Sequence, residues 1–358
     1  MQTVSLCMIV KNEEEVLERC LRSAAAFADE IIIADTGSTD HTREIAAQFT
    51  EHVHTFAWVD DFSAARNFAF SKASCDYQFW LDADDVIPPE SLARLLELKD
   101  TLTPDTDVVM LPYHVAFDEQ GAPVFTYERE RLLRREKAFQ WVGAVHEVIA
   151  PSGKILHYDA PIEHRKLHVH DPARNLRIFE RLQEEGKALD TRQKFYYARE
   201  LYYHGRYADA LEVYADFFRC KDAWIADRLT ACQHRAECLL ALGREQEAIS
   251  SLCESFSLAA PRAEVCCAIG QIFMQRKDYT QAAFWYETAL RTEFPAENAG
   301  FSQPDCHDFI PLMQLCVCHV RMGNRSIAKA YNDRAGRIKP SNPNVAYNRR
   351  YFQQLLHS

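Results

Sequence analysis

The sequence predicts an α/β domain with a mostly parallel sheet, followed by an all-α domain of helical repeats. In the first half of the chain, short apolar runs alternate with helical stretches, which is the β-α-β-α pattern of a parallel sheet. After about Asp171 the strand pattern ends and a helical pattern recurs. The 358 residues suffice for two domains of about 100 to 200 residues each. We expect the α/β domain at 1–170, a connecting helix at 171–192 and the repeats at 193–358.

Four short apolar runs are predicted to form the parallel part of the sheet. Each run is apolar on both faces, as expected for a central strand that helices cover on both sides. These runs are at 4–10, 31–34, 52–56 and 77–81. The intervening helices are expected at 13–26, 42–49 and 63–74.

A β-hairpin is predicted to follow the parallel strands. Two β-rich runs, at 108–117 and 125–134, flank the turn sequence Glu119-Gln120-Gly121. We therefore expect these two runs to pair antiparallel.

Helix-turn-helix segments recur four times in the second half of the chain. Their turns lie 34 to 46 residues apart, near the period of about 34 residues that helical repeats show. The turns are Gly205, Gly243, Lys277 and Gly323, with small residues five positions later (Ala210, Ala248, Ala282, Ala328) and seven positions earlier (Ala198, Ala236, Gly270, Cys316). The segments resemble tetratricopeptide repeats, most clearly at 205–214 and 278–286, and the fourth is degenerate. The alternative is a set of unrelated helical hairpins.

Charge and composition argue against several classes of protein. The net charge of −11 repels a nucleic-acid backbone, so we expect no nucleic-acid partner. No apolar run approaches the roughly 18 residues of a membrane span, and the N-terminal residues lack a secretory pattern. Nine of the 12 cysteines lie in apolar, helical contexts of the second half, and no Cys-x-x-Cys pair occurs. Reduced core thiols in a cytoplasmic protein are therefore expected, rather than zinc ligands or disulfides.

Polar residues follow three of the predicted parallel strands. They form the loops at 11–14, 35–40 and 82–85, and each loop carries carboxylates. Ligands of open α/β sheets bind outside the carboxyl ends of the strands. We therefore expect these three loops to converge on one binding edge.

The loop Asp82-Ala83-Asp84-Asp85 clusters acids that repel one another, a cost that a divalent cation offsets. Mg²⁺ and Mn²⁺ prefer a few carboxylates together with phosphate oxygens, so the loop suits a nucleoside diphosphate donor. The alternative is a solvated acidic loop before a helix that begins near Pro88.

Asp35 ends a fully apolar strand, where an unpaired acid is costly unless a ligand N–H group or a cation meets it. The rest of its loop has a simpler interpretation. Gly37 permits a tight turn, and Asp40 is expected mainly to cap the next helix.

Three segments together resemble the motifs of family 2 inverting glycosyltransferases. They are SLCMIVKNE at 5–13, IADTGSTD at 33–40 and WLDADD at 80–85, in the family's order and spacing. The resemblance covers roughly residues 1–170 and implies a GT-A fold, which is Rossmann-like. The repeats are similar to those of a bacterial branch that includes peptide cysteine S-glycosyltransferases acting on bacteriocin-like peptides.

The resemblance implies a UDP-sugar donor. Asp35 would face the uracil, and Val10 and Asn12 would line the base and ribose. Asp82 and the adjacent Ala83 would lie near the ribose or the metal.

The resemblance also implies Mn²⁺ or Mg²⁺, which Asp84 would ligate where it bridges the diphosphate and neutralises the leaving UDP. His164 matches a family position that closes over the diphosphate, and a neutral imidazole could complete the metal shell. His157, His168 and His170 are weaker candidates. A surface or hinge role is the alternative for each of these histidines.

Arg66 and Asn67 match the family's pattern and would contact the donor phosphate or sugar, the alternative being an ordinary helix face. Inversion needs a general base near the acceptor, for which Glu147 is the candidate, with His146 beside it. A structural pair that caps the next element is the alternative for these two residues. Trp141 would either stack on an acceptor or belong to the core.

These residues point to a metal-dependent inverting glycosyltransferase that transfers a sugar from a UDP-sugar to an acceptor. The acceptor could be a peptide, protein or glycan, and the repeats could also form a homodimer. Glu-Asp and Gln-x-x-Arg-Trp motifs of processive members are absent from the sequence, which argues against a polysaccharide synthase. One alternative is a catalytically silent domain on a protein-interaction scaffold. Another, a nucleotidyltransferase, would need a glycine-rich loop where residues 11–15 contain no glycine.

Overall fold

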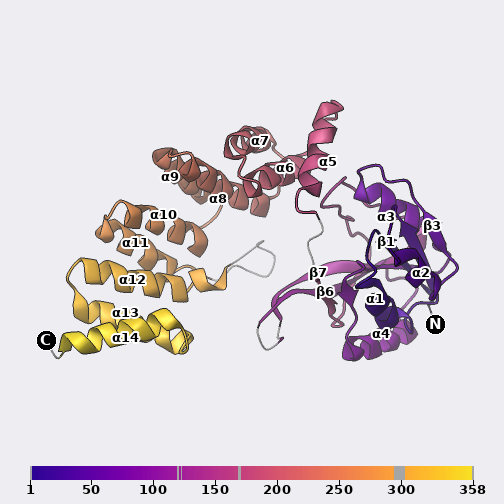
Figure 1. The fold of residues 1–358 in the computed structure, drawn as a ribbon, viewed down its shortest axis with the longest axis horizontal. Coiled ribbons are helices and arrows are strands. Elements are labelled where there is room, and N and C mark those ends of the chain that lie inside the picture. The colour runs from indigo at the N-terminus through magenta and orange to yellow at the C-terminus, as the bar shows by residue number, and fades with distance from the viewer. Residues whose placement is uncertain (1, 119–120, 122, 168–170, 294–302, 357–358) are drawn as a thin grey trace. The chain divides into compact units, whose positions relative to one another are not determined.

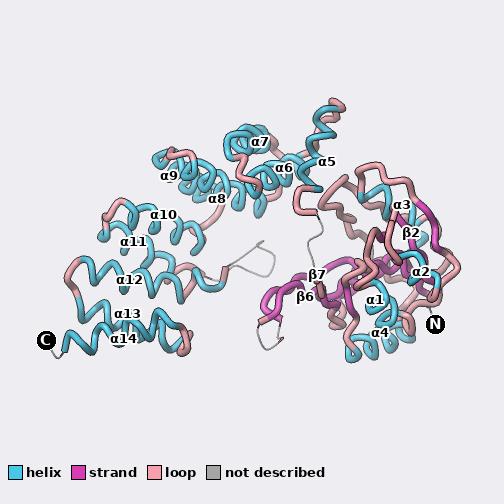
Figure 2. Tube along the Cα trace, in the orientation of Figure 1, coloured by secondary structure: helices cyan, strands magenta, loops and turns pink. Residues whose placement is uncertain are grey.

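The computed structural model describes every residue except 1, 119–120, 122, 168–170, 294–302 and 357–358 (Figure 1). The chain forms two compact units, Met1–Leu182 and Gln183–Ser358. Strands occur in the first unit, whereas the described part of the second unit consists of helices and loops (Figure 2). The predicted α/β domain and the predicted helical domain are both confirmed.

The first unit is built on a nine-stranded sheet with the order β3-β2-β1-β4-β7-β6-β9-β5, and β8 pairs with β6. The strands are β1 (Val4–Val10), β2 (Glu30–Asp35), β3 (Val53–Thr55), β4 (Tyr77–Trp80), β5 (Asp85–Val86), β6 (Val108–Phe117), β7 (Pro123–Arg134), β8 (Ile155–His157) and β9 (Ile162–His164). The first four strands are parallel, as the sequence predicts. Because β7 pairs antiparallel with β4, the described sheet is mixed, with five parallel and three antiparallel pairings.

The predicted hairpin is the antiparallel pair of β6 and β7. Two of its predicted turn residues, Glu119 and Gln120, lie outside the described residues, while Gly121 has the positive φ of 83° that a tight turn favours. The hairpin is longer than the other strands, and Figure 1 shows it extending beyond the body of the first unit. It therefore carries residues past the end of β4.

Helices cover both faces of this sheet. They are α1 (Leu17–Ala24), α2 (Thr42–Ala47), α3 (Phe62–Phe70) and α4 (Pro89–Thr101), and α5 (Arg174–Glu184) follows the sheet in the chain. Alternate residues of β1 point to opposite faces, as in any strand. Leu6 and Met8 pack in the core that includes α1 and α4, and Cys7 packs in the core that includes α3. The carboxyl ends of the strands remain available for a site between these layers.

The predicted helix at 13–26 is wrong at its start, because α1 begins at Leu17. The backbone N–H of Glu13 donates to Thr42 Oγ1 at 2.7 Å, and that of Glu14 donates to Asp40 Oδ2. Asn12 has a left-handed φ of 54°. These bonds tie the loop after β1 to the loop after β2, so the polar residues before α1 stay at the sheet edge.

The second unit repeats a helical hairpin. Its helices are α6 (Thr191–Tyr203), α7 (Tyr207–Arg219), α8 (Ile225–Ala241), α9 (Glu245–Glu254), α10 (Ala263–Gln275), α11 (Tyr279–Ala289), α12 (Phe309–Arg321), α13 (Arg325–Ile338) and α14 (Pro343–Leu356). All four predicted turn positions have a left-handed φ between 61° and 84°. The eight small residues predicted at the helix crossings are all buried. Small side chains let the paired helices approach closely, which explains their recurrence.

No helix among the described residues is long and apolar enough to cross a membrane. Nine of the twelve cysteine side chains are buried, where they pack as small apolar groups.

Candidate active site

A cavity of about 660 Å³ lies at the carboxyl ends of β1 and β4 in the first unit. Nine of the predicted site residues line it: Val10, Asn12, Arg66, Asp82, Ala83, Asp84, His146, Glu147 and His164. These residues are far apart in the sequence, and the fold brings them to one edge of the sheet. The three polar loops therefore converge as the topology argument predicts.

Asp35 and Asn67 do not line the cavity. Asp35 is buried, and its carboxylate accepts hydrogen bonds from Arg43 Nη1 at 2.9 Å and from the Ser38 N–H at 3.1 Å. The Asn67 side chain bonds the backbone N–H and C=O of Trp141. In this structure the guanidinium of Arg43 balances the charge of Asp35. Asn67 holds α3 against the segment before Glu147.

Asp85 organises the acidic loop, a role that the sequence did not single out. It is fully buried and forms an ion pair at 2.9 Å with Arg131, which is fully buried too. Its Oδ2 also accepts from the backbone N–H of Asp82 at 3.0 Å, and its Oδ1 accepts from the Tyr113 hydroxyl at 2.7 Å. Because protein donors occupy both oxygens, Asp85 fixes the loop and leaves Asp84 to face the cavity.

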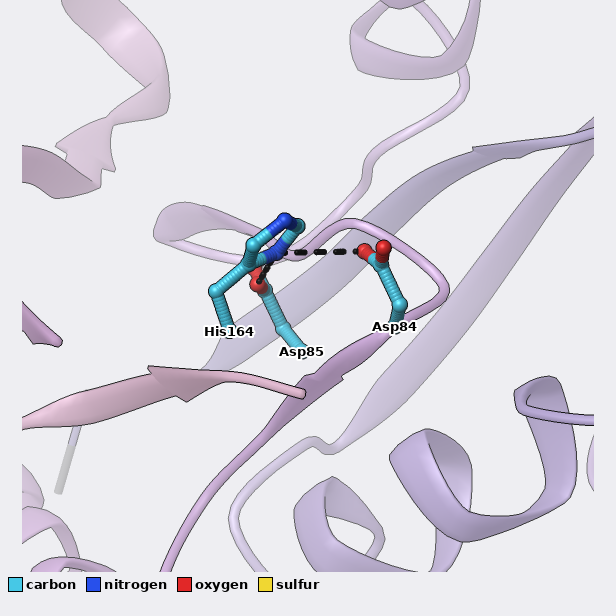
Figure 3. Close-up of side chains that lie close together, drawn as sticks. All are labelled: Asp84, Asp85 and His164. Atoms are coloured by element: carbon cyan, nitrogen blue, oxygen red, sulfur yellow. Dashed lines mark hydrogen bonds and ion pairs between the residues drawn. The ribbon is translucent and has the colours of Figure 1, made fainter. Parts of the chain in front are cut away.

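His164 lies beside the two acids (Figure 3). Its Nδ1 is 3.4 Å from Asp84 Oδ1, 3.4 Å from Asp85 Oδ1 and 2.9 Å from Tyr113 Oη. Ligand atoms of Asp84, Asp85 and His164 lie within 4.8 Å of one another, close enough to hold one metal ion. Carboxylate oxygens with an imidazole nitrogen suit Mn²⁺ or Mg²⁺, so the residues fit the expected cation.

The pKa directions at this cluster show excess negative charge. Burial and the carboxylates of Asp82 and Asp85 raise the pKa of Asp84, although His164 opposes the shift. Burial lowers the pKa of His164, but its bond to Asp85 and the nearby Asp84 raise it above its ordinary value overall. Burial, and then the carboxylates of Asp84, Asp82 and Asp40, raise the pKa of Glu13, which also lines the cavity, to about 7. A divalent cation would relieve this repulsion.

Arg66 connects the acidic loop to the predicted base. Its Nη2 bonds Asp82 Oδ1 at 2.7 Å, and its Nε bonds Glu147 Oε1 at 2.6 Å. The guanidinium also lies over the rings of Trp80 and Trp141, at 5.2 and 4.8 Å from their centroids. Burial alone would raise the pKa of Asp82, but Arg66 and Arg131 hold it well below its usual range.

A short closed loop presents His146 and Glu147 to the cavity. Val142 and Val148 exchange two backbone hydrogen bonds, of 2.9 and 3.1 Å, which close the loop at its base. Within it, Gly143 and His146 have left-handed φ values of 107° and 54°. With this geometry both predicted catalytic residues line the cavity, and Glu147 reaches Arg66.

Cations that the sequence did not identify also line the cavity: Lys11, Arg129, Lys166 and Arg174. Arg174 comes from the start of α5, and its guanidinium lies 4.5 Å from the centroid of the Phe62 ring. The Arg174 guanidinium forms no hydrogen bond or ion pair with another described residue, although its backbone N–H donates to the Asp171 carbonyl at 3.3 Å. An anionic ligand could use this charge, which no motif near the strands reveals.

The remaining candidates lie elsewhere. Trp141 belongs to the core, since it is 2% exposed and packs edge-on against Trp80 and Phe70. His157 pairs with Glu128 and does not line the cavity. His168 and His170 lie outside the described residues.

Comparison with known proteins agrees with this architecture. Residues 5–156 match the family model for glycosyl transferase family 2, and residues 263–293 match a tetratricopeptide repeat. A TPR repeat-containing protein of Synechococcus elongatus is 37% identical over 45% of this chain and 39% of its own length. The SPbeta prophage-derived glycosyltransferase SunS of Bacillus subtilis is 29% identical over 40% of this chain and 34% of its own.

The lipopolysaccharide core biosynthesis glycosyltransferase LpsC of Rhizobium meliloti is 28% identical over 42% of this chain and 58% of its own. The chain thus spans between about a third and three fifths of the length of these relatives. Among solved structures, S. aureus TarS 1–349 is 15% identical with a TM-score of 0.37, over 71% of this chain and 91% of its own. Residues 5–156 of this chain therefore form a glycosyl transferase family 2 domain, which is followed by helical repeats that include a tetratricopeptide repeat at 263–293.

Proposed function

We propose that the first unit is a metal-dependent inverting glycosyltransferase that moves a sugar from a UDP-sugar to an acceptor, with a peptide or protein side chain as the favoured acceptor. One observation supports this most. Asp84 and His164, which lie close enough to hold a metal ion, line the same cavity as Glu147. Arg66 links Glu147 to Asp82. A metal site and a base are what transfer from a nucleotide-sugar requires.

Asp84 and His164 would hold the cation, whose charge stabilises the diphosphate as it leaves. Asp85 keeps His164 in place through the Nδ1 contact, as carboxylates commonly orient a ligating imidazole. Arg129, Lys166 and Arg174 would add positive charge around the same diphosphate.

Glu147 would act as the general base. Its Oε1 accepts a hydrogen bond from Arg66, and its Oε2 accepts none from the described residues. That oxygen would take the proton of the acceptor heteroatom as this atom bonds the sugar C1 and the C1–O bond to UDP breaks. Val10 and Asn12 would line the base and ribose, with Asp82 and Ala83 near the ribose or the metal.

A thermal-shift titration tests the donor and the metal. We expect UDP with Mn²⁺ to raise the Tm of the wild type, because a ligand that binds only the native state stabilises it. GDP, CMP and UDP without Mn²⁺ should give smaller shifts. Asp84→Ala should lose the UDP response, whereas Asp100→Ala, an exposed acid on α4, should keep it. No shift with any nucleotide would favour a silent domain on a scaffold.

The base is tested separately. Glu147→Gln should bind UDP and Mn²⁺ as the wild type does, yet lose transfer. Full turnover by Glu147→Gln would show that another group takes the proton.

A further inference from the structure

One edge of β7 lacks a neighbouring strand beside the cavity. β4 pairs with β7 at residues 132–134, and β6 pairs with the other edge of β7 along its whole length. Among the described residues, no strand pairs with the β4-side edge of β7 between Pro123 and Glu130. Figure 1 shows β6 and β7 extending beyond the body of the first unit.

The backbone groups that face this edge can be identified. Trp80 Nε1 donates to the backbone C=O of Glu130 at 2.6 Å, so that carbonyl points away from β6. Backbone direction alternates along a strand, so the N–H and C=O groups of Glu128 and Thr126 point the same way. The register agrees, because Glu128 lies opposite Pro112, which has no N–H to exchange with it.

These backbone groups are open. Thr126 and Glu128 are exposed residues. The Thr126 side chain bonds His114 of β6, and the Glu128 side chain bonds His157 of β8. No hydrogen bond from another described segment reaches the outward backbone groups of Thr126 or Glu128. An unpaired edge of this kind is a template for an added strand.

The edge leads into the cavity. Arg129, the next residue on β7, lines the cavity together with Glu147. Phe125 and Tyr127 lie on the same face of β7 as Arg129, with their rings 5.9 Å apart, and Tyr127 is 39% exposed. A strand added here would alternate its side chains, so that every second one would meet this face.

We propose that the open edge of β7 at Thr126 and Glu128 binds an extended peptide segment of the acceptor as an added β-strand, which presents one of its side chains to the cavity. This inference rests on the proposed function. Extended peptides commonly bind proteins by strand addition, with affinity from main-chain hydrogen bonds and specificity from alternate side chains. The exposed ring of Tyr127 favours an apolar or aromatic residue next to the modified one.

A second copy of the chain fits this edge less well. Two outward residues give too short a ladder for a stable interface, which usually buries about 1,200 to 2,000 Å² in total. A two-fold pairing centred on Glu128 would place the two Glu128 carboxylates directly opposite each other, where like charges destabilise a cross-strand pair.

Proline substitution tests the edge without removing the side-chain face. Glu128→Pro removes the outward N–H but no bond to β6, because proline is tolerated at edge positions whose N–H faces solvent. Glu128→Ala is the matched control, since it removes the same side chain and keeps the N–H. Thr126→Pro and Thr126→Ala form a second pair of variants.

The probe is an array of 12-residue peptides of random sequence with a fixed central Cys, Ser or Thr, incubated with UDP and Mn²⁺. The strongest wild-type binders are then titrated against each variant. We expect each proline variant to weaken peptide binding about tenfold relative to its alanine control, as the loss of one main-chain hydrogen bond predicts. All four variants should keep the UDP and Mn²⁺ thermal shift of the wild type.

Equal peptide affinity of the proline and alanine variants would overturn the proposal, as would an array without binders to a wild type that still responds to UDP. A wild-type dimer that the proline variants alone dissociate, measured by light scattering, would assign the edge to a second copy instead. Absence of the UDP thermal shift in the wild type would contradict the proposed function. This measurement does not depend on peptide binding to the β7 edge. Circular dichroism of each variant confirms that it folds.

Discussion

The Nε of Arg66 lies 2.6 Å from Oε1 of Glu147, and the Nη2 of the same guanidinium binds Oδ1 of Asp82. The guanidinium is planar and rigid, so the two carboxylates are fixed relative to each other. The candidate base and the acidic loop are therefore held together as one unit, although Glu147 lies 65 positions after Asp82 in the sequence.

Arg66→Lys should reduce transfer about 100-fold, because one ammonium group cannot hold both carboxylates in a fork and a misplacement of about 1 Å can cost that much. The loss should appear in kcat more than in the KM for the donor. Steady-state kinetics of the purified variant check this. Arg134→Lys is the control, since Arg134 contacts two carboxylates, Asp107 and Glu136, and does not line the cavity.

Equal loss of activity in Arg66→Lys and Arg134→Lys would mean that general destabilisation explains the effect. A raised KM with unchanged kcat would instead assign Arg66 to donor binding.

Asp84 and Asp85 are adjacent, but replacing each with Asn should affect the free energy of unfolding differently. Asp85→Asn should lower the free energy of unfolding by about 3 kcal/mol, because it leaves Arg131 buried without a counter-ion. Asp84→Asn removes a carboxylate whose pKa burial and like charges raise, so it should leave stability unchanged or slightly higher. Chemical denaturation without metal measures both. Loss of the UDP and Mn²⁺ response with normal stability is expected of Asp84→Asn.

If Asp84→Asn destabilised the protein as much as Asp85→Asn does, the division between a structural acid and a metal-binding acid would be wrong.

Glu13 should make stability depend on pH. Burial first, and then Asp84, Asp82 and Asp40, raise its pKa from 4.5 to about 7. A raised pKa means that the folded state holds the proton more tightly, so the contribution to stability is full below pH 4.5 and is lost as pH rises through 7. Glu13→Gln cannot ionise, and its Tm should exceed that of the wild type by about 2 °C at pH 8 but not at pH 4.5.

Thermal melts in EDTA across this pH range measure the difference between Glu13→Gln and the wild type. A constant difference at every pH would show that the side chain acts through packing rather than charge. Glu14→Gln, an exposed neighbour, is the control.

The strands, the hairpin and the repeat turns followed from local sequence signals. Apolar runs located β1 to β4, because both faces of central strands are buried. Glycine at Gly205, Gly243 and Gly323 located turns that need a left-handed φ, and the same register predicted Lys277, where the backbone adopts φ 61° without glycine. Such signals depend on residues close in sequence.

The parts of the site that sequence could not predict depend on long-range pairs. Arg131 lies in the hairpin, 46 residues after Asp85, and neither residue's pattern indicates its partner. Arg43 likewise neutralises Asp35, which the motif alone left facing a ligand. The helix start at Glu13 was misplaced for the same reason, since side chains of the next loop bond the backbone there.

Gly270 should be needed for the crossing of α10 and α11. A Cβ at this position would lie 2.9 Å from Cζ of Tyr286, whose ring is buried. Overpacking of a core costs about 1 to 3 kcal/mol, whereas replacing a helical glycine with alanine gains about 1 kcal/mol. Gly270→Ala should therefore destabilise the helical unit by about 1 kcal/mol, measured as a loss of far-UV ellipticity at lower denaturant concentration.

A double-mutant cycle separates the two effects in Gly270→Ala. Tyr286→Leu removes the ring that the new methyl group would meet, so alanine in that background should gain its helix propensity without the clash. The cost of Gly270→Ala should then change sign between the two backgrounds. If alanine stabilised the chain equally with tyrosine and with leucine at 286, the recurring small residue would reflect helix propensity alone, and close helix approach would not explain it.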